Sequence, residues 1–209
     1  MNAKRATEVL AVLALVALVV RAEDKPAPKI VSAHFIEISE NTYPNDTEVH
    51  KFQHEVWIKG DSSRNETLQL GSKYSKNLSI LLSVGEMHYS YAQGKTHGFI
   101  STLPPQNITI LDRLEEIKKK GRKVGVEAVL GVDCEKYEQE FNYKKHISKR
   151  IYWISRANHF PVMATLEVNI QNAAGKSSET TIYKNIEINP DLPDSLFVPP
   201  NNVTFTPTK

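Results

Sequence analysis

The chain has 209 residues, of which 40% are hydrophobic and 24% charged, and its formal net charge is +2. Such a nearly neutral chain gives no electrostatic reason to expect binding to nucleic acid. Cys134 is the only cysteine, which excludes an internal disulfide, so packing must stabilise the fold. We expect Cys134 to be a small buried strand residue rather than a nucleophile.

Residues 1–22 have the features of a secretory signal peptide. Lys4 and Arg5 precede an apolar run over residues 9–20, and a cleavage position follows Ala22. The run is shorter than the roughly 20 apolar residues of a transmembrane helix, and an uncleaved anchor is the alternative. We therefore expect an exported protein, periplasmic if the source is bacterial and secreted if it is eukaryotic.

Residues 23–48 are expected to form a lead-in without a core pattern, and alternation begins after it. In residues 49–59, Phe52, Val56 and Ile58 share one face, whereas Trp57 is an aromatic residue on the polar face. Residues 60–63 predict a hairpin turn, and the chain returns in a second strand. This period is typical of a strand with one face against a core.

The same alternation recurs along the rest of the chain. It groups three sets of side chains on single strand faces: Met87, Tyr89 and Tyr91; then Val124, Val126, Ala128 and Leu130; and finally Val162, Ala164, Leu166, Val168 and Ile170. A strand is also predicted at 150–155, and Ile182, Ile186 and Ile188 are expected to lie together. Strands at short spacing, joined by local turns, predict an antiparallel meander.

One stretch has the spacing of a helix instead. Within residues 108–123, Ile110, Leu114 and Ile117 recur at i, i+4 and i+7, with Leu111 beside them, and Gly121 can end the helix. We expect an amphipathic helix of about three turns that lies across the sheet. Its basic end is interpreted as a solvated helix terminus rather than a patch for anionic surfaces.

Catalytic and metal-binding signals are weak. The sequence lacks the common nucleophile-elbow, phosphate-loop, zinc-protease and dinucleotide-binding motifs. On a strand, His50 and His54 stand about 13 Å apart, too far to share one metal ion. Five N-x-S/T sequons, at Asn45, Asn65, Asn77, Asn107 and Asn202, could carry glycans only in a eukaryotic secretory route. We expect no cofactor and no metal.

Three segments together resemble the LolA/LolB type of lipoprotein carrier and sorting proteins. They are "HEVWIKGDSSRNE", "LDRLEEIKKKGRKVGVEAVLGVDCEKYE" and "RIYWISRANHFPVMATLEV…IEINPDLPDSLFVPP", spanning about residues 49–200. The resemblance implies a mainly β, α+β fold: an open antiparallel half-barrel with a helical plug or lid over a hydrophobic cavity. Characterised members carry lipids or lipoprotein acyl chains there, which implies a non-catalytic, monomeric, ligand-binding protein.

The expected site follows from this resemblance and from the helix. Candidate ligand-binding residues are the apolar side chains Phe52, Trp57, Tyr89, Leu111, Leu114, Ile117 and Trp153, and for each of them plain core packing is the alternative. Arg64 matches the family's arginine after the K-G-D turn and is expected to contact the lid, with an exposed hairpin charge as the alternative. Two other functions stay open: an envelope structural or protein-interaction module with a self-filled core, and an enzyme on the same fold.

The segment that follows the last strand is rich in proline. Pro190 and Pro193 stop that strand, and residues 196–198 are expected to form a short edge piece in which Phe197 plugs an open end of the barrel. Residues 201–209 are expected to be a tail.

Overall fold

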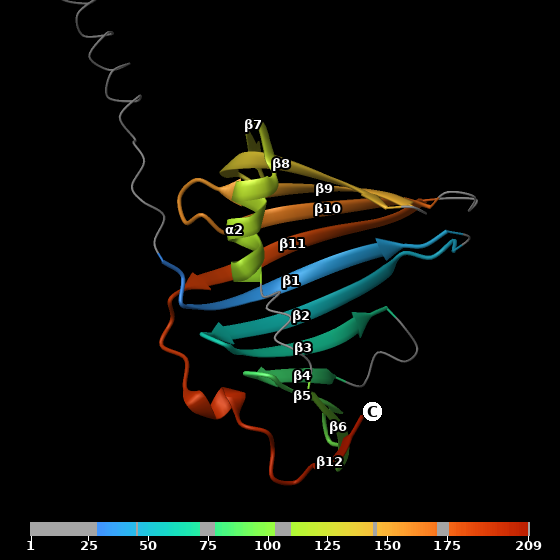
Figure 1. Cartoon of the computed structure of the whole chain (residues 1–209), viewed down its shortest axis with the longest axis vertical. Coiled ribbons are helices and arrows are strands. Elements are labelled where there is room, and N and C mark those ends of the chain that lie inside the picture. The colour runs from blue at the N-terminus through green and yellow to red at the C-terminus, as the bar shows by residue number, and fades with distance from the viewer. Residues whose placement is uncertain are drawn as a thin grey trace, which may run out of the picture.

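The computed structural model describes residues 29–44, 46–71, 78–102, 110–143, 146–170 and 176–208. The predicted signal peptide, residues 1–22, lies outside them. In the described part the chain forms one large sheet, one α-helix and one 3₁₀ helix (Figure 1). The helices are α2 (Ile110–Lys120) and η1 (Asp194–Phe197). The strands are β1 Ser32–Thr42, β2 His50–Lys59, β3 Ser62–Leu70, β4 Ser79–Val84, β5 Met87–Ala92, β6 His97–Thr102, β7 Arg122–Val129, β8 Val132–Tyr143, β9 His146–Ser155, β10 Pro161–Ile170, β11 Lys176–Ile188 and β12 Thr204–Pro207.

All these strands belong to a single sheet in the order β12-β6-β5-β4-β3-β2-β1-β11-β10-β9-β8-β7. Neighbours are antiparallel, apart from β12, which pairs in parallel with β6. Since β7 and β12 are the two edges of the sheet, it does not close on itself. The expected fold, a mainly antiparallel open half-barrel with a small helical part, is confirmed.

The two faces of the sheet are covered by different elements. We call the face against which α2 packs the inner face, and it carries the main core, including Phe35 of β1, Val56 of β2 and Tyr183 of β11. The opposite, outer face is covered at the β2–β5 end by the C-terminal segment, where Leu192 and Phe197 pack on Leu82. Apolar residues are therefore needed on both faces of the sheet.

A second outer-face cluster lies under β8–β10. The thiol of Cys134 is fully buried there beside Trp153 and Val162, as expected for a structural cysteine. The Nε1 of Trp153 donates to Glu127, and the Lys136 ammonium lies 5.1 Å from the centre of the indole ring. This cluster accounts for the burial of Trp153 on the face of β9 that points away from α2.

The sequence interpretation was wrong for several segments. Residues 32–42, expected within a lead-in, form β1, which pairs with both β2 and β11 in the middle of the sheet. Val126 and Leu130, expected to face a core, are 52% and 63% exposed, because β7 is an edge strand and Leu130 lies in the turn that follows it. Part of the expected tail forms β12, which pairs with β6.

Two β-bulges explain why two sets of side chains that were predicted to share one face of a strand do not do so. In β11 the register with β1 shifts near Asn185, which has a positive φ of 51°, so the alternation is interrupted. Ile186 and Ile188 consequently pack against the inner core, whereas Ile182 pairs with Met163 on the outer face. A register shift between Pro161 and Met163 likewise separates Val162, which lies in the outer cluster, from Ala164, which packs on the inner core.

The C-terminal segment is a packed part of the fold. Phe197 is only 7% exposed, in agreement with its predicted burial, but it covers the outer face rather than an open end of the barrel. Residues 194–197 form a 3₁₀ turn instead of an edge strand. Lys59, at the end of β2, anchors the segment to the sheet: its Nζ donates to the carbonyl of Leu192 (2.7 Å) and to Asp194 Oδ1 (2.6 Å).

Candidate ligand-binding face

The helix α2 lies across the inner face, in front of β9, β10 and β11 (Figure 1). Its apolar side chains Ile110, Leu114 and Ile117 are buried in the inner core, and Leu111 packs against it, as the spacing predicted. The helix ends at Gly121, whose N–H donates to the carbonyl of Ile117 at 2.7 Å. A methyl group at Gly121 would lie 2.4 Å from that carbonyl oxygen, so glycine permits this tight end.

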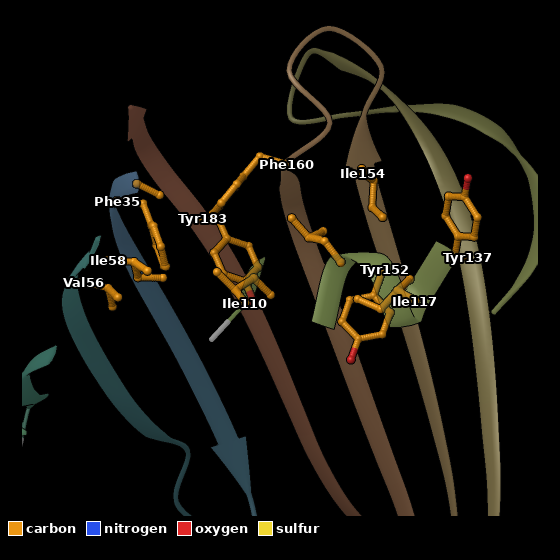
Figure 2. Packing of buried hydrophobic residues seen from close by; sticks show 12 residues of the cluster. Phe35, Val56, Ile58, Ile110, Ile117, Tyr137, Tyr152, Ile154, Phe160 and Tyr183 are labelled. Atoms are coloured by element: carbon orange, nitrogen blue, oxygen red, sulfur yellow. The ribbon is translucent and has the colours of Figure 1, made fainter. Parts of the chain in front are cut away.

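Aromatic rings form the surface beneath the helix. Phe35, Phe160 and Tyr183 make a triad with centroid distances of 5.1, 5.8 and 6.0 Å, all within the range of favourable aromatic pairing. Figure 2 shows these rings beside Tyr152, with Ile110 and Ile117 reaching them from α2. The inner face under α2 is thus filled by side chains of the sheet and the helix.

A polar cluster adjoins this apolar surface on the same face. Glu37 of β1 is directly opposite His54 of β2 on one side and Tyr183 of β11 on the other. The pKa of Glu37 is raised to about 7, first by burial and then by the nearby Glu179, while Arg113 of α2 opposes the shift. We call Glu37, His54 and Glu179 the carboxylate cluster.

The neighbouring polar side chains differ in their hydrogen bonds and in the effect of burial. Burial lowers the pKa of His54, whose Nδ1 lies 2.9 Å from Thr67 Oγ1. Thr181 donates to Glu179 at 3.1 Å. Burial also raises the pKa of the Tyr183 phenol well above its usual value. At neutral pH the region therefore holds the partly ionised carboxyl of Glu37 beside the uncharged imidazole of His54.

Away from α2, the inner face becomes partly open. The register row that begins at Val56 continues through Asn65, Leu81 and Ser90 to Phe99. Leu81 is 47% and Phe99 58% exposed. Apolar surface on the face that carries α2 thus extends beyond the area that the helix covers.

The predicted ligand residues divide between the two faces. Leu111, Leu114 and Ile117 lie together on α2, and Phe52 lies on the same face, where it is opposite Ser39. Trp57 and Tyr89 belong to the outer register row and pack on the C-terminal segment, and Trp153 lies in the other outer cluster. The seven side chains therefore do not line one common space.

Arg64 contacts a different element from the one expected. It lies in the outer row between Trp57 and Leu82, and its Nη1 donates to the carbonyl of Leu196 at 3.3 Å. It also pairs with Glu66 at 2.6 Å. Arg64 therefore bonds to the backbone of a segment that covers the sheet, but this segment is the C-terminal one on the outer face and not the helix α2.

Sequence reasoning missed the carboxylate cluster. The only local signal was Glu37 in "SAHFIEISENT", at a position with the same strand parity as Ala33 and Phe35. A charged residue at an otherwise core-facing position indicates a functional or paired group. The partners could not be identified because they come from β2, β11 and α2.

A hollow of about 580 Å³ lies beyond the C-terminal end of α2 rather than beneath the helix. Its lining mixes the basic residues Lys120, Arg122 and Lys149 with Glu138 and Glu140. Arg122 and Lys149 both approach Glu138, at 2.9 and 3.4 Å. The hollow is thus largely internally compensated in charge, and none of the predicted ligand residues lines it.

No group of three or more potential metal ligands occurs among the residues that the structure describes. In the same part of the chain no helix is long and apolar enough to cross a membrane. Of the sequons, Asn65 accepts a hydrogen bond from Thr67 and Asn202 is exposed in a turn. Asn45, Asn77 and Asn107 lie outside the described residues.

No protein-family model and no curated protein matches the sequence. Among solved structures, an uncharacterised conserved protein from Thermus thermophilus is 8% identical with a TM-score of 0.54, covering 86% of this chain and 92% of that one. A LolA superfamily protein from Nitrosomonas europaea is 11% identical with a TM-score of 0.42, covering 82% and 91%. A putative outer membrane lipoprotein-sorting protein domain from Vibrio parahaemolyticus is 12% identical with a TM-score of 0.36, covering 79% and 88%. At 8% identity, the likeness to the Thermus thermophilus protein is a likeness of fold alone.

Proposed function

We propose that the protein binds the apolar chain of a lipidic ligand between α2 and the inner face, with α2 acting as a lid, and that it catalyses no reaction. One observation carries the proposal. Among the described elements, the aromatic surface of Phe35, Tyr152 and Tyr183 is covered by a single 11-residue helix. An isolated helix of that length is only marginally stable in water and depends on its packing. We therefore expect that α2 can separate from the sheet.

The energies involved are compatible with lifting the lid. Fully burying a Leu or Ile side chain contributes about 1.5–3 kcal/mol, so the three buried helix residues contribute about 5–9 kcal/mol. An acyl chain gains about 0.8 kcal/mol per buried methylene, or about 10 kcal/mol for twelve of them. A ligand of that length that contacts both the sheet and the helix can offset the cost of separating them.

The ligand class follows from the sequence. The predicted signal peptide at residues 1–22 and the LolA-like motifs support an exported protein that meets acyl chains of lipids or lipoproteins in the envelope. In the proposed complex, Leu111, Leu114 and Ile117 contact the ligand from the lid, and Phe52 contacts it from the sheet. Trp57, Tyr89 and Trp153 remain core residues of the outer face.

A second candidate is favoured by the aromatic triad. Phe35, Phe160 and Tyr183 already fill the inner face, which is what an envelope structural or interaction module with a self-filled core requires. In that case α2 would be a permanent part of the core and no ligand would enter.

Leu114→Glu distinguishes these candidates. We would measure uptake of the apolar fluorophore diphenylhexatriene, together with the free energy of unfolding in urea. Lys119→Gln is the control, since it changes the charge of the same helix by the same amount at an exposed position. A folded Leu114→Glu protein that has lost uptake supports the lid. Severe unfolding of that variant, or no uptake by the wild type, supports the self-filled core.

A further inference from the structure

A polar row of side chains follows the apolar core on the inner face of β8 and β9. Tyr137 of β8 lies opposite Tyr152 of β9, and both rings belong to the inner core beneath α2 (Figure 2). Two residues further along these strands, about 7 Å away, Gln139 lies opposite Arg150. An apolar chain held under α2 would therefore meet Gln139 and Arg150 where it leaves the core.

Two polar side chains of this region are buried without a bonded neighbour. Gln139 is 9% exposed and lines the hollow beyond the end of α2. Ser148, which lies opposite Phe141 in the next row, is 7% exposed. No hydrogen bond joins either side chain to another residue in the described part of the chain. Because buried polar groups are normally hydrogen-bonded, the amide and the hydroxyl are available to a ligand.

Arg150 carries the charge that decides which ligand fits. Its guanidinium is half-buried over the ring of Phe141, 5.9 Å from the ring centre, and no ion pair joins it to any residue that the structure describes. The next carboxylate in its row belongs to Glu179, whose backbone is two strands and about 10 Å away. A guanidinium is a cation that only donates hydrogen bonds, so Arg150 favours an anionic acceptor.

The carboxylates of the hollow do not oppose an anion at this row. By alternation along β8, Glu138 and Glu140 lie on the other face of the strand from Gln139. Glu138 is also engaged by Arg122 and Lys149, at 2.9 and 3.4 Å. The charges that balance within the hollow are therefore mostly on the side away from α2.

The end of α2 supplies one further cation next to Gln139. A methyl group added at Gly121 would lie 3.4 Å from Cγ of Gln139, so the helix ends against this side chain. Lys120, the last residue of α2, lines the hollow, and its ion pair with Glu116 at 2.6 Å is solvent-exposed. Exposed ion pairs contribute little free energy, so an incoming anion can compete for the Lys120 ammonium.

We infer that Gln139, Ser148 and Arg150, which we call the head-group cluster, bind with Lys120 the anionic head group of an amphiphile whose apolar chain lies under α2. The head group is a carboxylate or a phosphate monoester. This inference rests on the proposed function, because the same ligand occupies both regions. A cationic head would be repelled by Arg150 and Lys120, whereas an anion accepts charge-assisted hydrogen bonds from them.

Three probes with the same fluorophore test the inference: diphenylhexatriene without a head group, with a propionate group, and with a trimethylammonium group. The uncharged probe reports on the apolar site alone. We expect the propionate probe to bind at least about tenfold more tightly than the trimethylammonium probe.

Arg150→Gln should remove most of this preference and leave binding of the uncharged probe unchanged. Arg156→Gln is the matched control, because it removes the same charge from the turn after β9, where Arg156 pairs with Asp133 at 2.9 Å; it should keep the preference. Arg150→Lys retains the charge and should keep part of it. Urea unfolding of each variant separates a lost head-group contact from a damaged fold.

Three competitors of the propionate probe identify the head group: laurate, dodecyl phosphate and dodecanol. Displacement by laurate or dodecyl phosphate at a lower concentration than by dodecanol supports the site, and the stronger of the two anions names the head group. Equal displacement by all three would overturn the site.

The outcomes separate the two proposals. If the trimethylammonium probe binds as tightly as the propionate probe, or if Arg150→Gln keeps the anionic preference, the head-group cluster is wrong while the proposed function stands. If no probe binds, the proposed function fails and this inference fails with it. An anionic preference that is lost in Arg150→Gln and kept in Arg156→Gln supports the cluster.

Discussion

Replacing Glu37 by Gln should stabilise the ligand-free protein at alkaline pH. The pKa of this carboxyl is raised from 4.5 to about 7 in the folded state, chiefly by burial. Its contribution to stability is therefore fully present below about pH 4.5 and is lost as the pH rises through 7. The difference of about 2.5 between the two pKa values corresponds to roughly 3 kcal/mol. Glutamine has a similar shape and no charge, so it avoids this loss.

Urea unfolding followed by circular dichroism at pH 5, 6, 7 and 8 measures the effect. The advantage of Glu37→Gln over the wild type should grow from near zero at pH 5 to about 2–3 kcal/mol at pH 8. Glu40→Gln, on the exposed face of β1, should show no such trend. Parallel pH profiles for wild type and Glu37→Gln would refute the burial of an uncompensated carboxyl.

Further predictions concern the C-terminal segment, the end of α2 and the Cys134 thiol. Phe197→Ala should lower the free energy of unfolding by about 3–5 kcal/mol, against less than about 0.5 kcal/mol for the exposed Val198→Ala; a loss below about 1 kcal/mol would contradict packing of the C-terminal segment. Gly121→Ala should destabilise by about 1–3 kcal/mol in the same assay, because its methyl would meet the helix backbone, whereas Gly125→Ala has free space; equal effects would contradict the tight helix end. Burial raises the pKa of the Cys134 thiol, so a thiol reagent at pH 8 should label it slowly in the folded protein and rapidly in urea; fast labelling of the folded protein would contradict its burial.

Local patterns were sufficient to predict the elements that have one apolar face. The spacing of Ile110, Leu114 and Ile117 gave the helix, its buried face and its end at Gly121. Alternation gave most of the strands from β2 onward. The motif resemblance predicted an open half-barrel but not the order of its strands.

The sequence could not show which face of each strand is inner. The sheet is covered by α2 on its inner face and by the C-terminal segment on part of its outer face. Trp57 and Trp153 are therefore packed although they lie on the outer face, away from the helix. β1 was missed because Glu37 and Ser39 interrupt its inner-face pattern, although it lies in the middle of the sheet. The bulge at Asn185 reverses alternation without a strong local signal.

The candidate site was predictable only in its helical half. Leu111, Leu114 and Ile117 followed from periodicity, whereas the carboxylate cluster depends on pairings between strands about 140 residues apart in sequence, such as β1 with β11. Contacts of this range are set by the sheet topology, which no local pattern encodes.

Photocrosslinking with a diazirine-labelled fatty alcohol tests the central claim, an apolar chain held between α2 and the sheet, most directly. After illumination and peptide mapping, we expect adducts on α2, within residues 110–120, and on the inner-face segment around Phe35 and Glu37. An excess of unlabelled fatty alcohol should suppress them. Adducts confined to the outer-face segment 192–197, or none that an excess of competitor suppresses, would contradict a ligand held between the helix and the sheet.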